Sequence, residues 1–149
     1  STDKIMMNAR VCVSPKLLDE TLNTYAGASA LVCDDFTMIN SFAGVGWQDR
    51  IGVLVESMMQ GNRDATQRRC VSGELFGRVV NPLYFYARVE NGSTRNVESG
   101  IEKTGYCHQY VLGAKVLLFP CVELRPEYRI IETNEFLRTR WVFQLHLYY

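Results

Sequence analysis

The sequence predicts an all-β protein: an antiparallel jelly-roll sandwich of about eight strands with at most one short helix. One observation is that apolar and polar residues alternate over several segments, which is the period of a half-buried strand. The other is that turn-forming dipeptides, among them Asn81-Pro82 and Asn91-Gly92, recur at a spacing that suits a sandwich. The 149 residues hold one core of ordinary size, so we expect a single domain over 1–149.

The alternation predicts where the strands lie. Trp141, Phe143 and Leu145 alternate with less apolar residues and predict that the chain ends in a strand. The segment 83–90 alternates in the same way before Asn91-Gly92-Ser93, which we expect to be a tight turn. Further strands are expected over residues 10–13, 30–39, 51–55, 70–80, 110–119 and 128–136.

Helical signal is confined to two segments. Ser14-Pro15 could cap a helix over 16–25, where Leu18, Leu22 and Tyr25 recur at three- and four-residue steps. Residues 47–60 also fit a 3.6-residue period. We favour a strand there, because Gly52 and the β-branched residues around it are poor helix formers.

The composition is that of a folded chain, with 47% hydrophobic and 21% charged residues. Sixteen Lys and Arg balance sixteen Asp and Glu, which removes the basic surplus typical of a nucleic-acid binder. No apolar run reaches the roughly 18 to 20 residues of a membrane-spanning helix, so no membrane partner is expected.

The sequence carries no enzyme signature. There is no nucleophile elbow, no phosphate-binding glycine loop, no metalloprotease motif and no calcium loop. The five cysteines show no CxxC spacing, which predicts neither a zinc site nor a disulfide framework. We therefore expect no catalysis, no cofactor and no metal.

Arginine and tyrosine point to recognition surfaces instead. Most of the cationic residues are arginine, which forms bidentate contacts to phosphate and carboxylate. Tyrosines of the strand over 83–90 and at the chain end fall on the face opposite the apolar one, where rows of tyrosine commonly mark contact surfaces. The candidate nucleic-acid contacts are Arg68, Arg69, Arg138 and Arg140, and the candidate subunit contacts are Tyr84, Tyr86 and Tyr148.

The segment 38–57, MINSFAGVGWQDRIGVLVES, is the most distinctive part of the chain. It resembles the early strand-turn-strand of small jelly-roll capsid proteins from circular single-stranded DNA viruses and plant satellite viruses. The expected turn-bracing motif is Gln48, Arg50 and Gly52. Arg50 would brace the corner by bonding turn carbonyls, and Gly52 would allow close strand approach.

This resemblance implies a viral capsid protein, a structural subunit that assembles with itself into an icosahedral shell of 60 copies or a multiple. The shell would enclose viral nucleic acid, and the protein would be made in the host cytoplasm or nucleus and reside in the virion. One departure is that residues 1–10 lack the Arg- and Lys-rich arm common in such proteins.

The alternative is a small α+β cone of the nuclear-transport-factor-like kind, an enzyme or ligand-binding protein. Its pocket would hold Asp35, His108 and His146 as acid-base groups. The segment 47–60 discriminates the two, since a strand there supports the shell and a helix supports the cone.

Overall fold

The computed structural model describes residues 6–18, 21–33, 36–48, 50–62, 66–98 and 101–148. These residues form strands and turns, and none of them is helical. The strands are β1 (Met6–Val13), β2 (Lys16–Leu17), β3 (Leu22–Cys33), β4 (Phe36–Trp47), β5 (Ile51–Asn62), β6 (Gln67–Val80), β7 (Leu83–Glu98), β8 (Ile101–Phe119), β9 (Val122–Thr133) and β10 (Leu137–Leu147).

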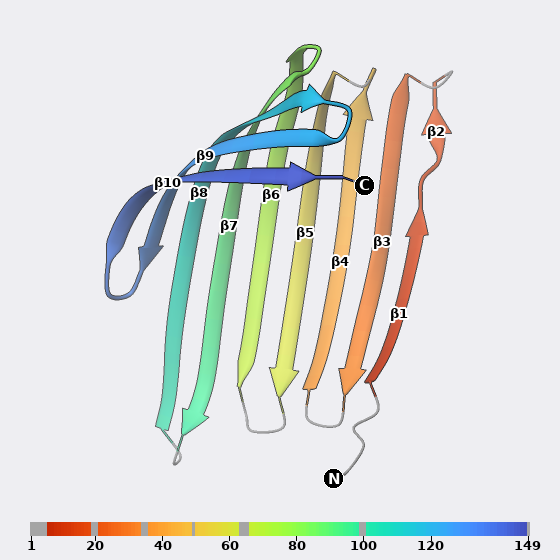
Figure 1. Ribbon diagram of the computed structural model, residues 1–149. Helices are drawn as coiled ribbons and strands as arrows, with labels where there is room; N and C mark the ends of the chain where they lie inside the picture. Colours follow the sequence, from red (N-terminus) through yellow and green to blue (C-terminus); the bar gives the residue numbers. More distant parts are fainter. Residues whose placement is uncertain are drawn as a thin grey trace.

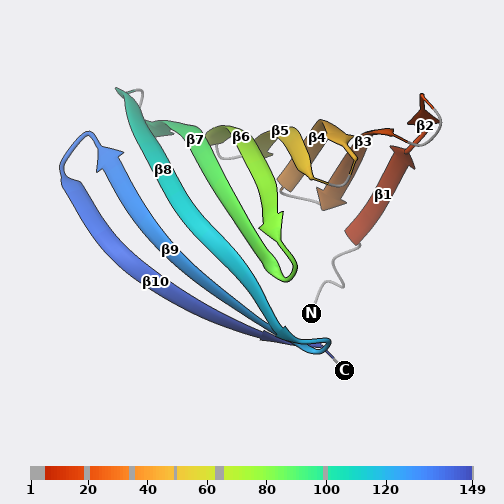
Figure 2. The ribbon, with the colours of Figure 1, turned by 90° about the horizontal axis from the view of Figure 1, so that it is seen from above.

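All ten strands belong to one antiparallel sheet (Figure 1). The order is β1-β3-β4-β5-β6-β7-β8-β9-β10, and the short β2 pairs with β3. Seen from above, the sheet curls into an open C whose two free edges are β1 and β10 (Figure 2). The all-β antiparallel prediction is confirmed. The two-layered jelly roll is not what the described strands form, because short connections keep each strand beside its chain neighbour.

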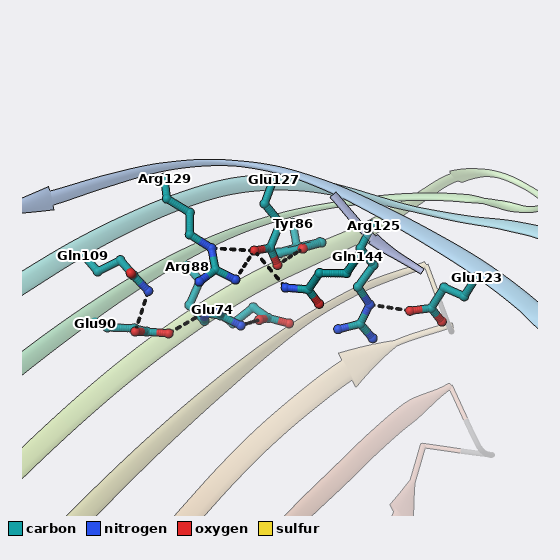
Figure 3. A network of polar contacts seen from close by, with 10 residues as sticks. All are labelled: Glu74, Tyr86, Arg88, Glu90, Gln109, Glu123, Arg125, Glu127, Arg129 and Gln144. Carbon is teal, nitrogen blue, oxygen red and sulfur yellow. Dashed lines mark hydrogen bonds and ion pairs between the residues drawn. The ribbon is translucent and has the colours of Figure 1, made fainter. Parts of the chain in front are cut away.

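The pairing register assigns every strand residue to one of two faces, since directly paired residues point the same way. We call the face inside the curl the inner face, where Tyr86 and Glu127 are seen (Figure 3). The opposite face is the outer face. One inner row runs Gly46, Gly52, Phe76, Tyr86, Gly113, Glu127 and Val142. The neighbouring outer row runs Val45, Val53, Leu75, Ala87, Leu112, Tyr128 and Trp141.

Glycines on the inner face accept aromatic rings from the adjacent strand. A Cβ added at Gly52 would lie 2.8 Å from Cε2 of Phe76, and one added at Gly113 would lie 2.5 Å from the Tyr86 hydroxyl. Gly27 and Gly44 are covered in the same way by Phe42 and Tyr25. A glycine without a side chain on the inside of a bend lets the sheet curve, and the ring fills the space that the glycine leaves. These pairs therefore account for part of the curl.

Three local predictions are wrong. The strand expected over 30–39 is divided between the end of β3 and the start of β4, which are antiparallel. The helix expected over 16–25 is replaced by β2 and the start of β3, where pairing with β4 overrides the three- and four-residue spacing. The turn expected at Asn91-Gly92-Ser93 lies inside β7, where Gly92 pairs with Cys70 and Cys107. The strand preferred within 47–60 is confirmed as β5.

The β4–β5 turn shows what the expected bracing motif does. The Arg50 backbone N–H donates to the Trp47 carbonyl over 2.9 Å, and the Gln48 N–H donates to the Thr21 carbonyl over 2.8 Å. The bracing thus comes from backbone groups at both positions. Gly52 is buried, and the space that its missing side chain leaves is occupied by the ring of Phe76 on β6.

Gln48 has φ of 48°, in the left-handed region that suits glycine. We expect Gln48→Gly to raise the free energy of unfolding by about 0.5–1 kcal/mol, because the strain of this residue is relieved. The measurement is denaturant unfolding of both proteins in the same medium. Gln60→Gly in the body of β5 is the control and should lower stability; a loss of stability in Gln48→Gly would contradict the prediction.

Candidate functional site

The outer face is apolar and open to its surroundings. Leu112 is 63% exposed and Trp141 66% exposed, and Val45, Val53 and Leu75 of the same row are exposed as well. By contrast, Val111 at 2% is the only apolar side chain that is buried among the described residues. The distribution is the reverse of that in a water-soluble sandwich, whose apolar faces are hidden.

The accessible surface gives the same result for the whole molecule. It amounts to 10800 Å², whereas a compact monomer of 17.0 kDa is expected to expose about 7,700 Å². The excess comes from a single sheet with no second layer on its outer face. Something other than this chain's described residues must cover that face if the protein is stable.

Charged side chains on the outer face are confined to one end of the sheet. In the described ranges they are Arg69, Arg95, Glu102 and Glu132, all near the start of β6 and the connections at that end. Arg95 and Glu102 pair with each other over 2.7 Å. The rest of the outer face, from Val71 and Val89 toward the opposite end, carries apolar and small residues.

The inner face of β6–β10 instead carries a network of charged and polar side chains (Figure 3). At its centre is Glu127 on β9, which is 2% exposed. The Tyr86 hydroxyl donates to Glu127 Oε1 over 2.5 Å, passing above Gly113, and Arg129 Nε donates to Oε2 over 2.6 Å. Gln144 on β10 donates to the same carboxylate over 3.4 Å. The buried carboxylate therefore ties three strands together.

A second buried carboxylate lies four residues away on the same strand. Glu123 is 1% exposed and accepts from Lys115 Nζ over 2.9 Å and from the Tyr148 hydroxyl over 3.1 Å. It also pairs with Arg125 on its own strand. Burying a carboxylate costs free energy unless it is paired and hydrogen-bonded, and both conditions hold here.

A third cluster extends the network to β6 and β7. Arg88 pairs with Glu90 over 2.7 Å and with Glu74 over 3.4 Å. Gln109 on β8 donates to the other oxygen of Glu90 over 2.8 Å. The inner face of the C-terminal half is thus polar and cross-linked, whereas Glu56 is the only charged residue at the described inner positions of β3–β5.

The carboxylates of the network have shifted pKa values. Burial alone would raise the pKa of Glu127, but hydrogen bonds from Tyr86 and Arg129 and the charges of Arg129 and Arg88 lower it below 4.5 overall. The pKa of Glu123 is also lowered overall. Burial alone would raise it, but hydrogen bonds from Lys115, Arg125 and Tyr148 lower it. For Tyr86, burial and then the bond to Glu127 raise the pKa of the phenol, which stays protonated.

This arrangement predicts acid sensitivity. A carboxylate with a depressed pKa stabilises the folded state at pH above its unfolded value of about 4.5. That contribution is lost as the pH falls through the lower, folded value. We expect the free energy of unfolding to fall between about pH 5 and pH 3, as measured by denaturant titration at several pH values.

Glu102→Gln, which removes the exposed pair with Arg95, is the matched control. It should leave the acid sensitivity in place, whereas Glu127→Gln should weaken it. A stability that is flat over this pH range in the unmodified protein would contradict the prediction.

The structure divides the predicted arginines between the two faces. Arg138 and Arg140 lie on the inner face of β10, and Arg68 lies on the inner face of β6. Arg69 points outward. The four residues therefore do not form one nucleic-acid surface, because Arg68 and Arg69 are adjacent on β6 and so point to opposite faces.

The predicted interface tyrosines all lie on the inner face. Tyr86 and Tyr148 are hydrogen-bonded to Glu127 and Glu123, and Tyr84 lines the same hollow as Tyr86 and Lys115. Sequence reasoning missed Glu123 and Glu127, the best-buried polar residues. The signal available was the Glu-x-Arg spacing repeated at 123–125 and 127–129, which places carboxylate and guanidinium on one face of a strand.

The residues of the cone alternative are not brought together. His108 lies on the outer face, 2.5 Å from Asn91 Oδ1, and His146 lies on the inner face beside Gln144. Asp35 lies outside the described residues. In the part of the chain that the structure describes, no cluster of His, Cys, Asp and Glu could hold a metal, and the five cysteines are free thiols.

Comparison with protein-family models, with curated proteins and with solved structures finds no match for this chain. None of the described residues belongs to a helix long and apolar enough to cross a membrane. Any function must therefore be argued from the two faces of the sheet.

Proposed function

We propose that this protein is a membrane-embedded sheet, whose strands cross the hydrocarbon layer with the outer face against lipid and the inner face turned away from it. The observation that carries the proposal is the exposed apolar outer row, which runs from Val45 on β4 to Trp141 on β10 and lies directly behind buried, ion-paired carboxylates. Lipid chains would supply the apolar partner that this face lacks within the described chain.

The dimensions of the strands support this assignment. β3, β4 and β5 each contain 12 residues, which at about 3.3 Å per residue span about 40 Å. With a tilt of about 45° they would cross about 28 Å, close to the thickness of the hydrocarbon core. Apolar or small uncharged residues occupy the alternate, outer positions over that length, as in a membrane-crossing strand.

The placement of charge and of backbone groups supports it as well. Outer-face charges of the described residues gather at one end, where a membrane surface would lie, and the inner face holds the rest. Each strand inside the sheet is hydrogen-bonded on both sides, so its backbone needs no water. In lipid the free edges β1 and β10 would have to pair with each other or with further copies of the chain. The proposal departs from the expectation of no membrane partner, which rested on the length of apolar runs and so addressed helices only.

The experiment is flotation of the full chain with phosphatidylcholine vesicles, followed by an alkaline carbonate wash and circular dichroism. We expect the protein to float, to resist the wash and to show a β spectrum. The capsid protein that the sequence resemblance implies would not float with vesicles. A second copy would cover the outer face, and the protein would form large water-soluble particles without lipid or detergent. Protein that stays with the aqueous fraction would overturn the membrane proposal.

A further inference from the structure

The inner face carries a row of arginines. Arg88 on β7, Arg129 on β9 and Arg140 on β10 occupy one register row, with Val111 of β8 between the first two. Arg140 lies directly opposite Arg129. Like charges in directly opposed positions of a sheet repel each other, so this row needs negative charge nearby.

Carboxylates of the chain compensate only part of the row. Arg88 is held by Glu74 and Glu90, and Arg129 is held by Glu127. Arg138 and Arg140, two residues apart on the inner face of β10, form no ion pair with any residue that the structure describes. Both side chains are exposed, so their charge is available to a solute.

The inner face also has a hollow, which lies beyond these two arginines toward the other end of the sheet. It is lined by Glu74, Phe76, Tyr84, Tyr86, Lys115 and Arg125. The described inner face of β6–β10 thus has more cations than carboxylates. A cationic surface with low-dielectric walls concentrates anions, and arginine-lined passages favour them over cations.

We propose that the inner face lines a water-filled path through the membrane and that Arg138 and Arg140 draw small inorganic anions, such as chloride or phosphate, into it. This inference rests on the membrane-embedded sheet proposed above. Guanidinium groups suit this role because they stay charged at every physiological pH and bind oxyanions with two donors.

The test is ion selectivity of the full chain reconstituted into a planar lipid bilayer. Under a potassium chloride gradient we expect a reversal potential that reports a preference for chloride. The double variant Arg138→Gln/Arg140→Gln should lower the chloride-to-potassium permeability ratio by about twofold or more. The double lysine variant should retain the preference. The matched control is Arg69→Gln, which removes an outer-face arginine and should leave the ratio unchanged.

The possible outcomes distinguish a failure of the anion path from a failure of the membrane-embedded sheet. A protein that floats with vesicles but conducts no ions, or whose selectivity is the same in the double glutamine variant, would overturn the inference and leave the membrane-embedded sheet standing. A protein that does not enter vesicles would overturn both.

Discussion

Replacement of Leu112 by arginine is expected to lower the free energy of unfolding of the vesicle-embedded protein by about 2–4 kcal/mol. Leu112 lies in the outer row, within the apolar band, and is 63% exposed. In water, so exposed a side chain tolerates substitution, and the change would amount to about 0.5 kcal/mol or less. In lipid the guanidinium would have to leave water, which is costly near the centre of the bilayer.

The control is the same substitution at the charged end of the outer face. Val97 pairs with Glu102 and is 42% exposed, so Val97→Arg should cost only about 0–1 kcal/mol. Denaturant unfolding in vesicles, followed by tryptophan fluorescence, measures both. Equal effects at the two positions would contradict a lipid-facing outer face, because only a bilayer makes the cost depend on depth.

The sequence predicts where the strands lie better than it predicts which of their faces is exposed. The alternation at the chain end correctly predicts β10, and Gly52 with its β-branched neighbours correctly favours β5 over a helix. Local pattern succeeds there because a strand's period of two is independent of what lies on either side. Local pattern fails at 16–25. Leu22 and Tyr25 fit helical spacing, but in the sheet their side chains lie on opposite faces.

The alternation of apolar and polar residues does not predict which face lies inside the curl. A sandwich and a lipid-facing sheet both show one apolar face, and the sandwich hides that face while the curled sheet exposes it. The tyrosines at Tyr84 and Tyr86 were correctly separated from the apolar face. The alternation alone does not determine whether the apolar face lies inside or outside the curl, since that depends on register, glycine positions and the surrounding solvent.

The buried carboxylates were missed for a related reason. Glu123 and Glu127 lie in a segment that also contains Arg125 and Arg129, and such a charge pattern ordinarily marks a solvated strand. Their burial arises from contacts with β7, β8 and β10, through Tyr86, Lys115 and Tyr148. Partners so distant along the chain become visible only once the register is known.

The second large effect is expected at Gly113. Gly113→Ala should lower the free energy of unfolding by about 2–4 kcal/mol, because the new Cβ would lie 2.5 Å from the Tyr86 hydroxyl oxygen and displace that ring. Tyr86 would then lose its hydrogen bond to Glu127, and the Oε1 oxygen of this carboxylate, which is 2% exposed, would be left without its donor. Overpacking and the lost hydrogen bond each contribute about 1–3 kcal/mol.

Two further variants separate these contributions. Tyr86→Phe removes the hydroxyl and keeps the ring, so it should cost about 1–2 kcal/mol, less than Gly113→Ala. Gly73→Ala is the matched control, because its Cβ would meet no atom within 4 Å and would point to the outer face. It should leave stability unchanged or raise it by about 0.5 kcal/mol, since glycine weakens a strand interior. If Gly113→Ala and Gly73→Ala have equal stability, the tyrosine does not occupy the glycine's space. The curl of the sheet would then depend on other contacts.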